Sequence, residues 1–507
     1  MGKKLVSLFT LLAFIIFSLS CTVTKTKKVR VTTLASWKGK EVKILGIMKI
    51  SGEYIAFDEE RPGRVFENNI VGYVGTESIS IPFSEVEMVW ARIKRVDAGR
   101  TVLAGIGIYV GVGLVVVAIV LATKKSCPFI YSFDGEKHIF DAEPYGGAIC
   151  EGLKRTEWCG LEHLKDVNGQ YRIMVTNEVN ETQYTDELKL VVVDHPQGVK
   201  VTPDISGRIR TVSQPVIPIL AYDNKGKDLM PFISKNDKVF WVSRDEGKSP
   251  EKKEDLRDEL IFEFPKPGGA KKAKLLINAC NTLWGSQSLK RYLDLYGDKV
   301  DEWYDEVNNL GPAYFKMVNT HVREELYSLQ IRVETEDGWR SKGLIIGGGP
   351  FISEDKVYSL DISDVPGDTL RIKLTPPAAF WMINCLAVDY TEDLPVQVTE
   401  IEAIEAVDHK GQDVRGMLKS NDNNYLIMPN IGDRADLIFE SPPHMEGMER
   451  TVILKASGYY DIHLEGKGEP QLQIIDKIYS EPGFAVQYAF KEFLKWKKEI
   501  MAKITDK

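Results

Sequence analysis

The sequence predicts a mainly β protein: a small β-barrel, one transmembrane helix, then two tandem antiparallel β-sandwich modules with a helical insertion. Three observations support this prediction. Short runs of alternating apolar and polar residues fill positions 41–98, an uncharged apolar run occupies positions 101–123, and strand-like segments recur in the same order along the remainder. Hydrophobic residues make up 43% of the 507 positions, which is enough material for packed cores.

The N-terminal residues 1–20 have the pattern of an export signal. Two lysines supply its positive charge, an apolar run follows, and Ser18 and Ser20 are the small residues that a signal peptidase requires. With Cys21 directly after it, the segment resembles the signal of bacterial lipoproteins. That resemblance implies a lipid on Cys21, a tether over residues 21–40 and a membrane-anchored place in the bacterial cell envelope. Ordinary signal cleavage without lipidation stays open as the alternative.

Residues 41–98 are predicted to form five short strands. The runs VKILGIM, EYIAF, NIVGYV, ISIPF and VEMVWARI alternate apolar and polar residues, and glycine and proline lie between them. A period of two is typical of strands that bury one face. So many strands in so short a span predict a small barrel, and no cluster of residues within it indicates catalysis.

Residues 101–123 form an uncharged apolar run long enough to cross a bilayer as a helix. Gly107 and Gly111 are spaced so that two such helices can approach closely, which predicts self-association; the competing interpretation is that glycine is common in membrane helices. A single crossing would place residues 124–507 on the opposite side from the preceding segment, whereas a broken helix would leave both parts exported. Analogy with envelope lipoproteins favours export.

An internal duplication follows the apolar run. Residues 221–228 match residues 406–413 in the pattern Ala-x-Asp-x-Lys-Gly-x-Asp, and Leu-Ile-Phe-Glu recurs at 260–263 and 437–440. Shorter matches on either side keep the same order. Because the order is preserved with small gaps, we expect two copies of one structural unit.

Each copy is predicted to be one antiparallel β-sandwich, with the first over residues 127–283 and the second over residues 327–466. The matched pieces are strand-like runs joined by turns rich in Asp, Gly and Pro. Three pairs of positions test this alignment: Asp223 and Asp408 in equivalent turns, Phe262 and Phe439 facing inward on equivalent strands, and Gly226 and Gly411 at positive φ.

Helices are predicted in two places. Residues 284–326, present in the first copy alone, carry an apolar stripe at helical spacing, which favours a packed helical insertion over a ligand site. Residues 484–505 form a closing amphipathic helix, for which docking on the second sandwich is a simpler expectation than lying on a membrane. The stripe consists of Leu289, Tyr292, Leu293, Tyr296, Val300, Trp303 and Val307.

Residues 127–148 are the segment densest in chemistry-bearing side chains. They contain CPF-x-Y-x-x-DG, beginning at Cys127, and DAEPYGGA, beginning at Asp141. These motifs resemble those of an uncharacterised bacterial envelope protein family, and the resemblance extends to about residue 385. It implies a family without a known activity, so it predicts a location and no reaction.

Two metal sites can be considered in this segment. Asp134, Asp141 and Glu143 are candidate Ca²⁺ ligands, but their spacing lacks the register of known calcium loops, and turn-capping carboxylates are the simpler explanation. A set of Cys and His residues is spaced too irregularly for a zinc finger or ribbon. No other cofactor is predicted, and a disulfide within this set stays open. The set comprises Cys127, His138, Cys150, Cys159 and His163.

The sequence favours binding over catalysis. A net charge of -8 argues against nucleic acid as a partner, and the chain has no P-loop, no G-x-S-x-G elbow and no H-E-x-x-H motif. We expect a membrane-anchored binding or scaffold lipoprotein without catalytic activity, with a glycan or an envelope protein as partner. The alternative is a hydrolase of envelope glycans, because a catalytic pair of carboxylates leaves no motif. Candidate ligand contacts are Trp284, Trp303, Trp339 and Trp381, with core packing as the competing interpretation.

Overall fold

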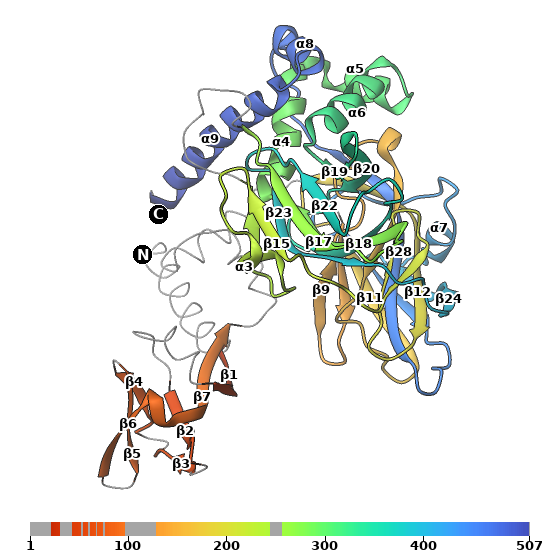
Figure 1. The fold of residues 1–507 in the computed structure, drawn as a ribbon. Coiled ribbons are helices and arrows are strands. Elements are labelled where there is room, and N and C mark those ends of the chain that lie inside the picture. The colour runs from red at the N-terminus through yellow and green to blue at the C-terminus, as the bar shows by residue number, and fades with distance from the viewer. Residues whose placement is uncertain are drawn as a thin grey trace, which may run out of the picture. The chain divides into compact units, whose positions relative to one another are not determined.

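The computed structural model divides the chain into two compact units, Met1–Thr101 and Val102–Lys507 (Figure 1). Among the residues that the structure describes, strands account for 45% and helices for 20%, which confirms a mainly β protein with several antiparallel sheets. The structure describes residues 22–30, 43–51, 54–58, 61–66, 68–74, 77–96, 128–243 and 256–505.

Two small antiparallel sheets share one apolar core in the first unit. The strands are β1 (Thr22–Arg30), β2 (Lys43–Lys49), β3 (Tyr54–Ala56), β4 (Arg64–Phe66), β5 (Asn69–Val74), β6 (Glu77–Pro82) and β7 (Val86–Val96), with a 3-10 turn η2 (Phe83–Glu85). The sheet orders are β1-β7-β2-β3 and β4-β5-β6. Ile44 and Ile70, from different sheets, are fully buried in the common core. Gly72 is required there, because a Cβ at this position would collide with the ring of Phe57.

Residues 22–30 differ from the sequence expectation. The sequence predicts a tether over residues 21–40, whereas the structure forms β1, paired with β7 from Thr22 opposite Val96 to Arg30 opposite Met88. The lysines in this segment suggested a solvated chain. Its threonines and valines have high strand propensity, and the edge of β7 offers them backbone partners.

Several sequence predictions concern residues outside the described ranges. These are the signal peptide at residues 1–20, the lipidation site Cys21, the transmembrane helix at residues 101–123, and Cys127. Among the helices that the structure does describe, none is both long enough and apolar enough to cross a bilayer. The membrane crossing at residues 101–123 therefore stays a prediction.

The second unit contains two β-sandwiches, named sandwich 1 and sandwich 2. One sheet of sandwich 1 contains, in spatial order, β25 (Ala403–Asp408), β27 (Arg434–Glu440), β11 (Gln170–Thr176), β8 (Phe129–Phe133) and β9 (His138–Ala142). The other contains β10 (Arg155–Gly160), β28 (Glu449–Ile462), β12 (Glu181–His195) and β24 (Gln397–Ile401), with β26 (Leu426–Met428) also paired to β12. Ile173 of the first sheet and Leu454 of the second are both buried in one core.

Sandwich 2 is built in the same way. Its first sheet contains β15 (Leu220–Asp223), β17 (Leu260–Pro265), β22 (Thr369–Leu374), β19 (Ser328–Thr335) and β20 (Gly338–Ile346). Its second sheet contains β16 (Trp241–Val242), β23 (Trp381–Asp389), β18 (Lys272–Asn281) and β21 (Glu354–Asp361). Short connecting elements are η4 (Glu151–Leu153), β13 (Lys200–Pro203), β14 (Ile209–Val212), α3 (Met230–Ile233) and α7 (Arg415–Leu418).

The two sandwiches have one topology. Every strand of the sheet β25-β27-β11-β8-β9 has a counterpart at the same place in the sheet β15-β17-β22-β19-β20. In the facing sheets, β10, β28, β12 and β26 correspond to β21, β18, β23 and β16. The duplication predicted from the sequence is therefore present at the level of strand order.

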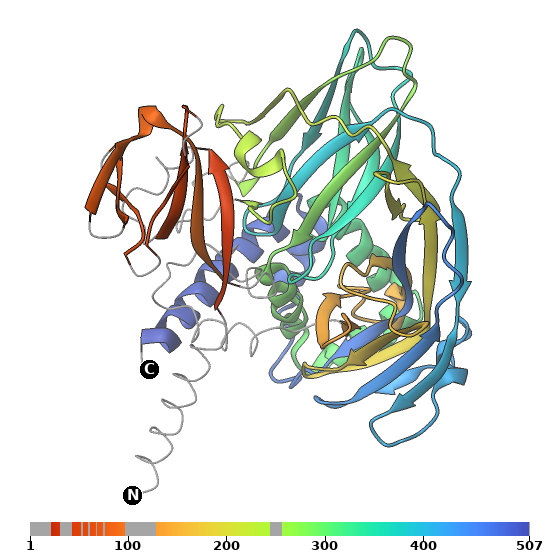
Figure 2. The ribbon, with the colours of Figure 1, turned by 90° about the horizontal axis from the view of Figure 1, so that it is seen from below.

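The two copies nevertheless exchange their halves, because each sandwich combines the first half of one copy with the second half of the other. The prediction that residues 127–283 form one sandwich and residues 327–466 the other is wrong in this respect. Sandwich 1 combines residues 129–195 with residues 397–462, and sandwich 2, formed within residues 220–389, lies between these two segments in the sequence. Strands β12 and β28 pair along their full length, and Figure 2 shows this sandwich combining yellow and blue strands from distant parts of the chain. Periodicity predicts which face of a strand is buried, and it does not identify which copy supplies the neighbour.

The equivalent positions behave as the alignment predicts. Phe262 on β17 and Phe439 on β27 are both fully buried. Gly226 and Gly411 have φ values of 76° and 81°. The turns also match: the Oδ1 of Asp223 accepts the backbone N–H groups two and four residues later at 2.9 Å, and the equivalent carboxylate in the second copy does the same at 2.9 and 2.8 Å.

Helices lie in the two predicted segments, and one further helix, α8, lies at residues 472–480, where none was predicted. The insertion contains α4 (Leu283–Leu293), the 3-10 turn η6 (Asp294–Lys299), α5 (Val300–Asn308) and α6 (Pro312–Glu324), and the end of the chain contains α8 (Leu472–Ser480) and α9 (Phe484–Thr505). Figure 1 shows these helices together at one end of the second unit. Leu289, Val300 and Val307 of the apolar stripe are buried, as core packing requires. Helix α9 packs mainly on α4, α6 and α8, which corrects its predicted docking on a sandwich.

Candidate functional site

Three tyrosines from distant segments meet at the surface of sandwich 1. Tyr184 on β12 lies directly opposite Tyr459 on β28, and Tyr425 immediately precedes β26. The rings of Tyr184 and Tyr459 are stacked, with centroids 4.5 Å apart and planes 7° from parallel. Tyr425 stands nearly perpendicular to them, with its centroid 5.8 and 5.5 Å from theirs. Tyr459 is buried, but Tyr184 and Tyr425 are half-buried, so this tyrosine site presents aromatic surface to solvent.

Lys154 connects the aromatic rings to the surrounding polar groups. Its Nζ pairs with the buried carboxylate of Asp186 and donates to the Oδ1 of Asn423 (2.6 Å) and the hydroxyl of Tyr425 (3.2 Å). The same nitrogen lies 4.8 Å from the centroid of the Tyr425 ring. Partial burial acts to lower the pKa of Lys154, but the hydrogen bonds to Asp186 and Tyr425 outweigh it and raise that pKa. The lysine is therefore a fixed cation beside the rings.

Asp186 holds the segment that carries Tyr425. A β-bulge between Thr185 and Glu187 inserts Asp186 into β12 without a partner on β28. Its carboxylate accepts the backbone N–H of Asn423 at 2.9 Å. Asn423 itself has a φ of 68°, a conformation that asparagine tolerates better than most residues. One extra residue in a strand thus fixes both a lysine and a loop at the site.

A second carboxylate, that of Asp461, lies on the same face of β28 two residues beyond Tyr459. Burial raises the pKa of Asp461 to about 6; the negative charge of Glu151 adds to this effect and the hydroxyl of Tyr184 opposes it. Its Oδ1 is buried and has no hydrogen-bond partner among the residues that the structure describes. The carboxyl group is therefore stabilised in its neutral form.

Asp461→Asn is expected to stabilise the protein at neutral pH. The pKa of Asp461 is about 6 when folded and 3.8 in the reference state, so the folded protein binds the proton more tightly. The stability contributed by this group is complete below pH 4 and is lost as the pH rises through 6. Allowing for partial exposure, we expect a gain of about 1 to 2 kcal/mol at pH 7.5. Urea denaturation of the unsubstituted protein and of Asp461→Asn at pH 4.5 and 7.5 measures the difference between their free energies of unfolding. The same difference at both pH values would contradict the expectation.

The candidate calcium ligands take part in separate interactions. Asp134 caps a turn through the backbone N–H groups of the next residues, which lower its pKa. Asp141 is buried and contacts the Nδ1 of His163 at 2.8 Å, and Glu143 accepts the backbone N–H of Phe351 at 2.8 Å. No group of three or more His, Cys, Asp or Glu residues within the described ranges is arranged to hold a metal ion. These placements match the turn-capping and structural alternative.

The Cys and His residues of the same segment are also dispersed. Cys150 and Cys159 are buried free thiols in this structure. Burial raises the pKa of Cys150 to about 12, and that of Cys159 is raised as well, so neither is a ready metal ligand or nucleophile. His138 is exposed on β9, whereas His163 contacts the buried Asp141.

Three of the four tryptophans proposed as ligand contacts are buried. Trp284, Trp303 and Trp381 expose 2%, 3% and 0% of their surface. Trp381 also donates from Nε1 to the backbone carbonyl of Glu325 at 3.1 Å, as buried tryptophans commonly do. Only Trp339, half-buried on β20, remains accessible within this set. The other three therefore follow the core-packing interpretation.

The sequence did not indicate the tyrosine site. Tyr184, Tyr425 and Tyr459 are brought together by the pairing of β12 with β26 and β28. That pairing follows from the exchange of halves between the two copies. The one local signal is the position of Tyr184 in the segment ETQYTDELKL, which an alternating pattern places on a strand without indicating its neighbours.

A small cavity lined by glutamates bears on the hydrolase alternative. Its volume is about 20 Å³, close to the roughly 10–15 Å³ that one water requires. Each carboxylate in its lining already has a partner: Glu143 accepts backbone N–H groups, Glu157 accepts that of Tyr145 at 2.6 Å, and Glu354 pairs with Lys356 at 2.6 Å. The cavity is thus too small for a sugar ring, and its carboxylates serve the structure.

The chain matches no protein-family model, and a search of curated proteins finds no match to it. The resemblance of its motifs to those of uncharacterised envelope proteins therefore stays a prediction.

Proposed function

We propose that this chain is a membrane-anchored binding or scaffold protein of the bacterial cell envelope, and that the tyrosine site contacts a glycan. The observation that supports this proposal is the composition of the site. Aromatic rings reach the surface beside a fixed lysine and an exposed asparagine, Asn423. Sugar rings have apolar faces bordered by hydroxyls, and they fit a surface on which aromatic and hydrogen-bonding groups alternate.

The anchor in this proposal rests on the N-terminal sequence. A lipid on Cys21 and a helix at residues 101–123 would each hold the chain at a membrane. Gly107 and Gly111 would let two such helices associate. Incorporation of labelled fatty acid, lost in Cys21→Ser, is the measurement that tests the lipid.

Hydrolysis of envelope glycans has less support than binding. A glycosidase needs two carboxyl groups free to exchange protons or attack the sugar. The glutamates of the small cavity are engaged by backbone N–H groups and by Lys356. At the tyrosine site, Asp461 has the raised pKa that suits a general acid, but Asp186, the other carboxylate described there, is engaged by Lys154 and by the backbone of Asn423. The arrangement of these groups favours contact over catalysis.

Tyr184→Ala and Tyr425→Ala are each expected to weaken binding to purified peptidoglycan sacculi about tenfold or more, because buried aromatic contacts dominate binding surfaces. Tyr184→Phe keeps the ring and should retain most of the affinity. Co-sedimentation of the full-length, detergent-solubilised protein with sacculi measures this. Phe315→Ala, which removes an aromatic ring of 57% exposure elsewhere on the second unit, is the matched control.

Two outcomes would contradict the proposal. One is that the unsubstituted protein does not sediment with sacculi. The other is that Phe315→Ala and Tyr184→Ala lose binding to the same extent, because the retention would then reflect general adhesion of aromatic side chains.

A further inference from the structure

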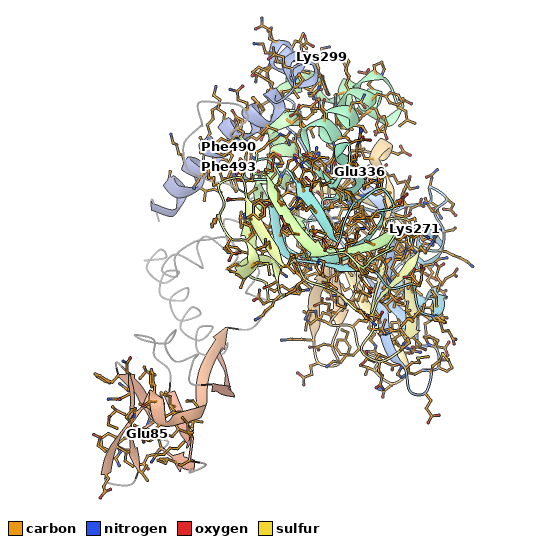
Figure 3. All side chains as sticks on the ribbon, in the orientation of Figure 1. Glu85, Lys271, Lys299, Glu336, Phe490 and Phe493 are labelled. Atoms are coloured by element: carbon orange, nitrogen blue, oxygen red, sulfur yellow. The ribbon has the colours of Figure 1, made fainter. Side chains whose placement is uncertain are left out.

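Helix α9 has two sides of different character. On one side Phe490 and Phe493 are buried, where the helix contacts α4, α6 and α8 (Figure 3). On the other side Lys491, Lys495 and Lys498 follow one another at intervals of four and three residues, and all three are exposed. Residues at these intervals share one face of a helix. These three residues are named the lysine stripe.

The lysine stripe carries positive charge that the protein does not balance. Lys495 pairs with Glu492 at 2.5 Å, and the other glutamate of the helix pairs with an arginine of α4. Lys491 and Lys498 form no ion pair or hydrogen bond with the residues that the structure describes. Helix α9 contains five lysines and only two glutamates, in a chain of net charge -8. Positive charge concentrated on one face of an acidic protein indicates an anionic partner.

The lysine stripe lies near the point at which the described part of the second unit begins. Phe129, in β8, is buried in an apolar cluster with Leu283 and Phe351, and Trp496 of α9 packs against this cluster. A helix is about 10–12 Å wide with its side chains. Roughly one helix diameter therefore separates the cluster around Phe129 from the lysine stripe.

A short piece of chain joins Phe129 to the predicted membrane segment. Five residues, 124–128, separate it from the apolar run at residues 101–123. Even fully extended, five residues reach at most about 18 Å. The run would end at a bilayer surface whether it crosses once or returns as a broken helix. The length of the chain thus holds Phe129, and α9 with it, close to the bilayer that the run enters.

The exposed face of α9 suits lipid headgroups and does not suit the hydrocarbon interior. No large apolar residue of the helix is exposed among those whose side chains the structure describes. A helix that inserts into the interface needs a free apolar face, and in α9 that face is packed on the neighbouring helices. Lysines attract anionic headgroups over about one Debye length without inserting.

We propose that the lysine stripe docks on anionic phospholipid headgroups, so that the helical end of the second unit lies against the membrane surface. This inference rests on the membrane anchor in the proposed function and concerns a surface separate from the tyrosine site. It gives α9 a partner on its basic side, while its apolar side stabilises the helical part of the second unit.

The test compares lysine reactivity in the full-length protein reconstituted into vesicles of phosphatidylcholine alone or with about 30% phosphatidylglycerol. N-hydroxysuccinimidyl acetate, which is uncharged, acetylates accessible lysines, and mass spectrometry gives the rate at each position. Phosphatidylglycerol should slow the reaction of Lys491 and Lys498 about fivefold or more relative to Lys271 and Lys410 in the same molecules. These two reference lysines are exposed on the sandwiches, and Figure 3 shows Lys271 on the opposite side of the second unit from α9.

Reversal of charge gives a variant test. In the double variant Lys491→Glu with Lys498→Glu, the remaining member of the stripe, Lys495, should react equally fast in both kinds of vesicle. About 0.5 M NaCl should have a similar effect on the unsubstituted protein, because salt screens the attraction. Lys225→Glu with Lys419→Glu, which reverses two exposed lysines of the sandwiches, is the matched control and should leave the protection of the stripe unchanged.

Extraction of the vesicles with alkaline carbonate separates failure of the anchor from failure of this inference. A chain that is extracted contradicts the anchor, and this inference fails with it. A chain that stays with the lipid while Lys491 and Lys498 react as fast as the reference lysines contradicts the docking alone. Equal protection of the stripe in both kinds of vesicle also contradicts it, because something other than anionic lipid, such as a protein partner, would then cover the lysines.

Discussion

Replacing Phe262 or Phe439 with alanine is expected to lower the free energy of unfolding by about 3 to 5 kcal/mol each, because a large buried ring is lost and the surroundings refill the space only in part. Phe262 lies opposite Ile372 on the neighbouring strand, and Phe439 lies opposite Tyr171. Both phenylalanines are fully buried. Urea denaturation followed by near-ultraviolet circular dichroism measures the loss.

The control for this pair is a change at the exposed aspartates of the matching turns, Asp228→Ala and Asp413→Ala, which should alter stability little. Because the two phenylalanines belong to different sandwiches, each substitution should weaken a different one. Losses that are small for one phenylalanine and large for the other would contradict the equivalence of the two copies.

Lys154→Met is expected to destabilise the protein by about 3 kcal/mol. The carboxylate of Asp186 is fully buried, and without the lysine it retains only backbone N–H donors to balance its charge. Asp186→Asn removes that charge, so adding it to Lys154→Met should restore part of the loss. Urea denaturation of the two single variants and the double variant measures the coupling.

Lys299→Met is the matched control, because Lys299 pairs with Glu302 on an exposed helix turn, where ion pairs contribute little. If Lys154→Met were no more destabilising than Lys299→Met, the pair formed by Lys154 and Asp186 would not be the structural link described here. Additive effects of Lys154→Met and Asp186→Asn would lead to the same conclusion.

Local patterns predicted much of this fold. Alternation identified the strands that carry Phe262 and Phe439, and the repeated turn sequence predicted the positive φ of Gly226 and Gly411. These features depend on residues close in sequence, such as an Asp whose carboxylate accepts N–H groups from its own turn. Such local features form in the same way whichever sheet the segment joins.

The exchange of halves could not be predicted in this way. The two copies have the same strand order, and β18 is the counterpart of β28 in the other copy. The alternating pattern of β12 therefore suits β18 as a neighbour as well as it suits β28. The choice between them depends on connections and on packing across the whole unit. The short link between Asp389 and Gln397 leads directly from β23 into β24, which pairs with β12.

The candidate site was missed for a related reason. Tryptophan was chosen as the contact residue on composition, but Trp284 and Trp381 are large rings that fill the core between elements. Tyr184 and Tyr425 became neighbours only through the pairing of distant strands. Aromatic residues give no sequence signal that separates a buried ring from one at the surface.

The nested arrangement of the sandwiches has a consequence for the order in which the chain can fold as it is made. Sandwich 2 is complete once residue 389 has emerged, but β12 has only the short strands β24 and β26 to pair with until its full-length partner β28 arrives. During that interval the first half of sandwich 1 has unpaired strand edges, which are prone to pair with other chains. A chain that stops before residue 449 would therefore carry a finished inner sandwich and an open outer one, and would be expected to aggregate or be degraded.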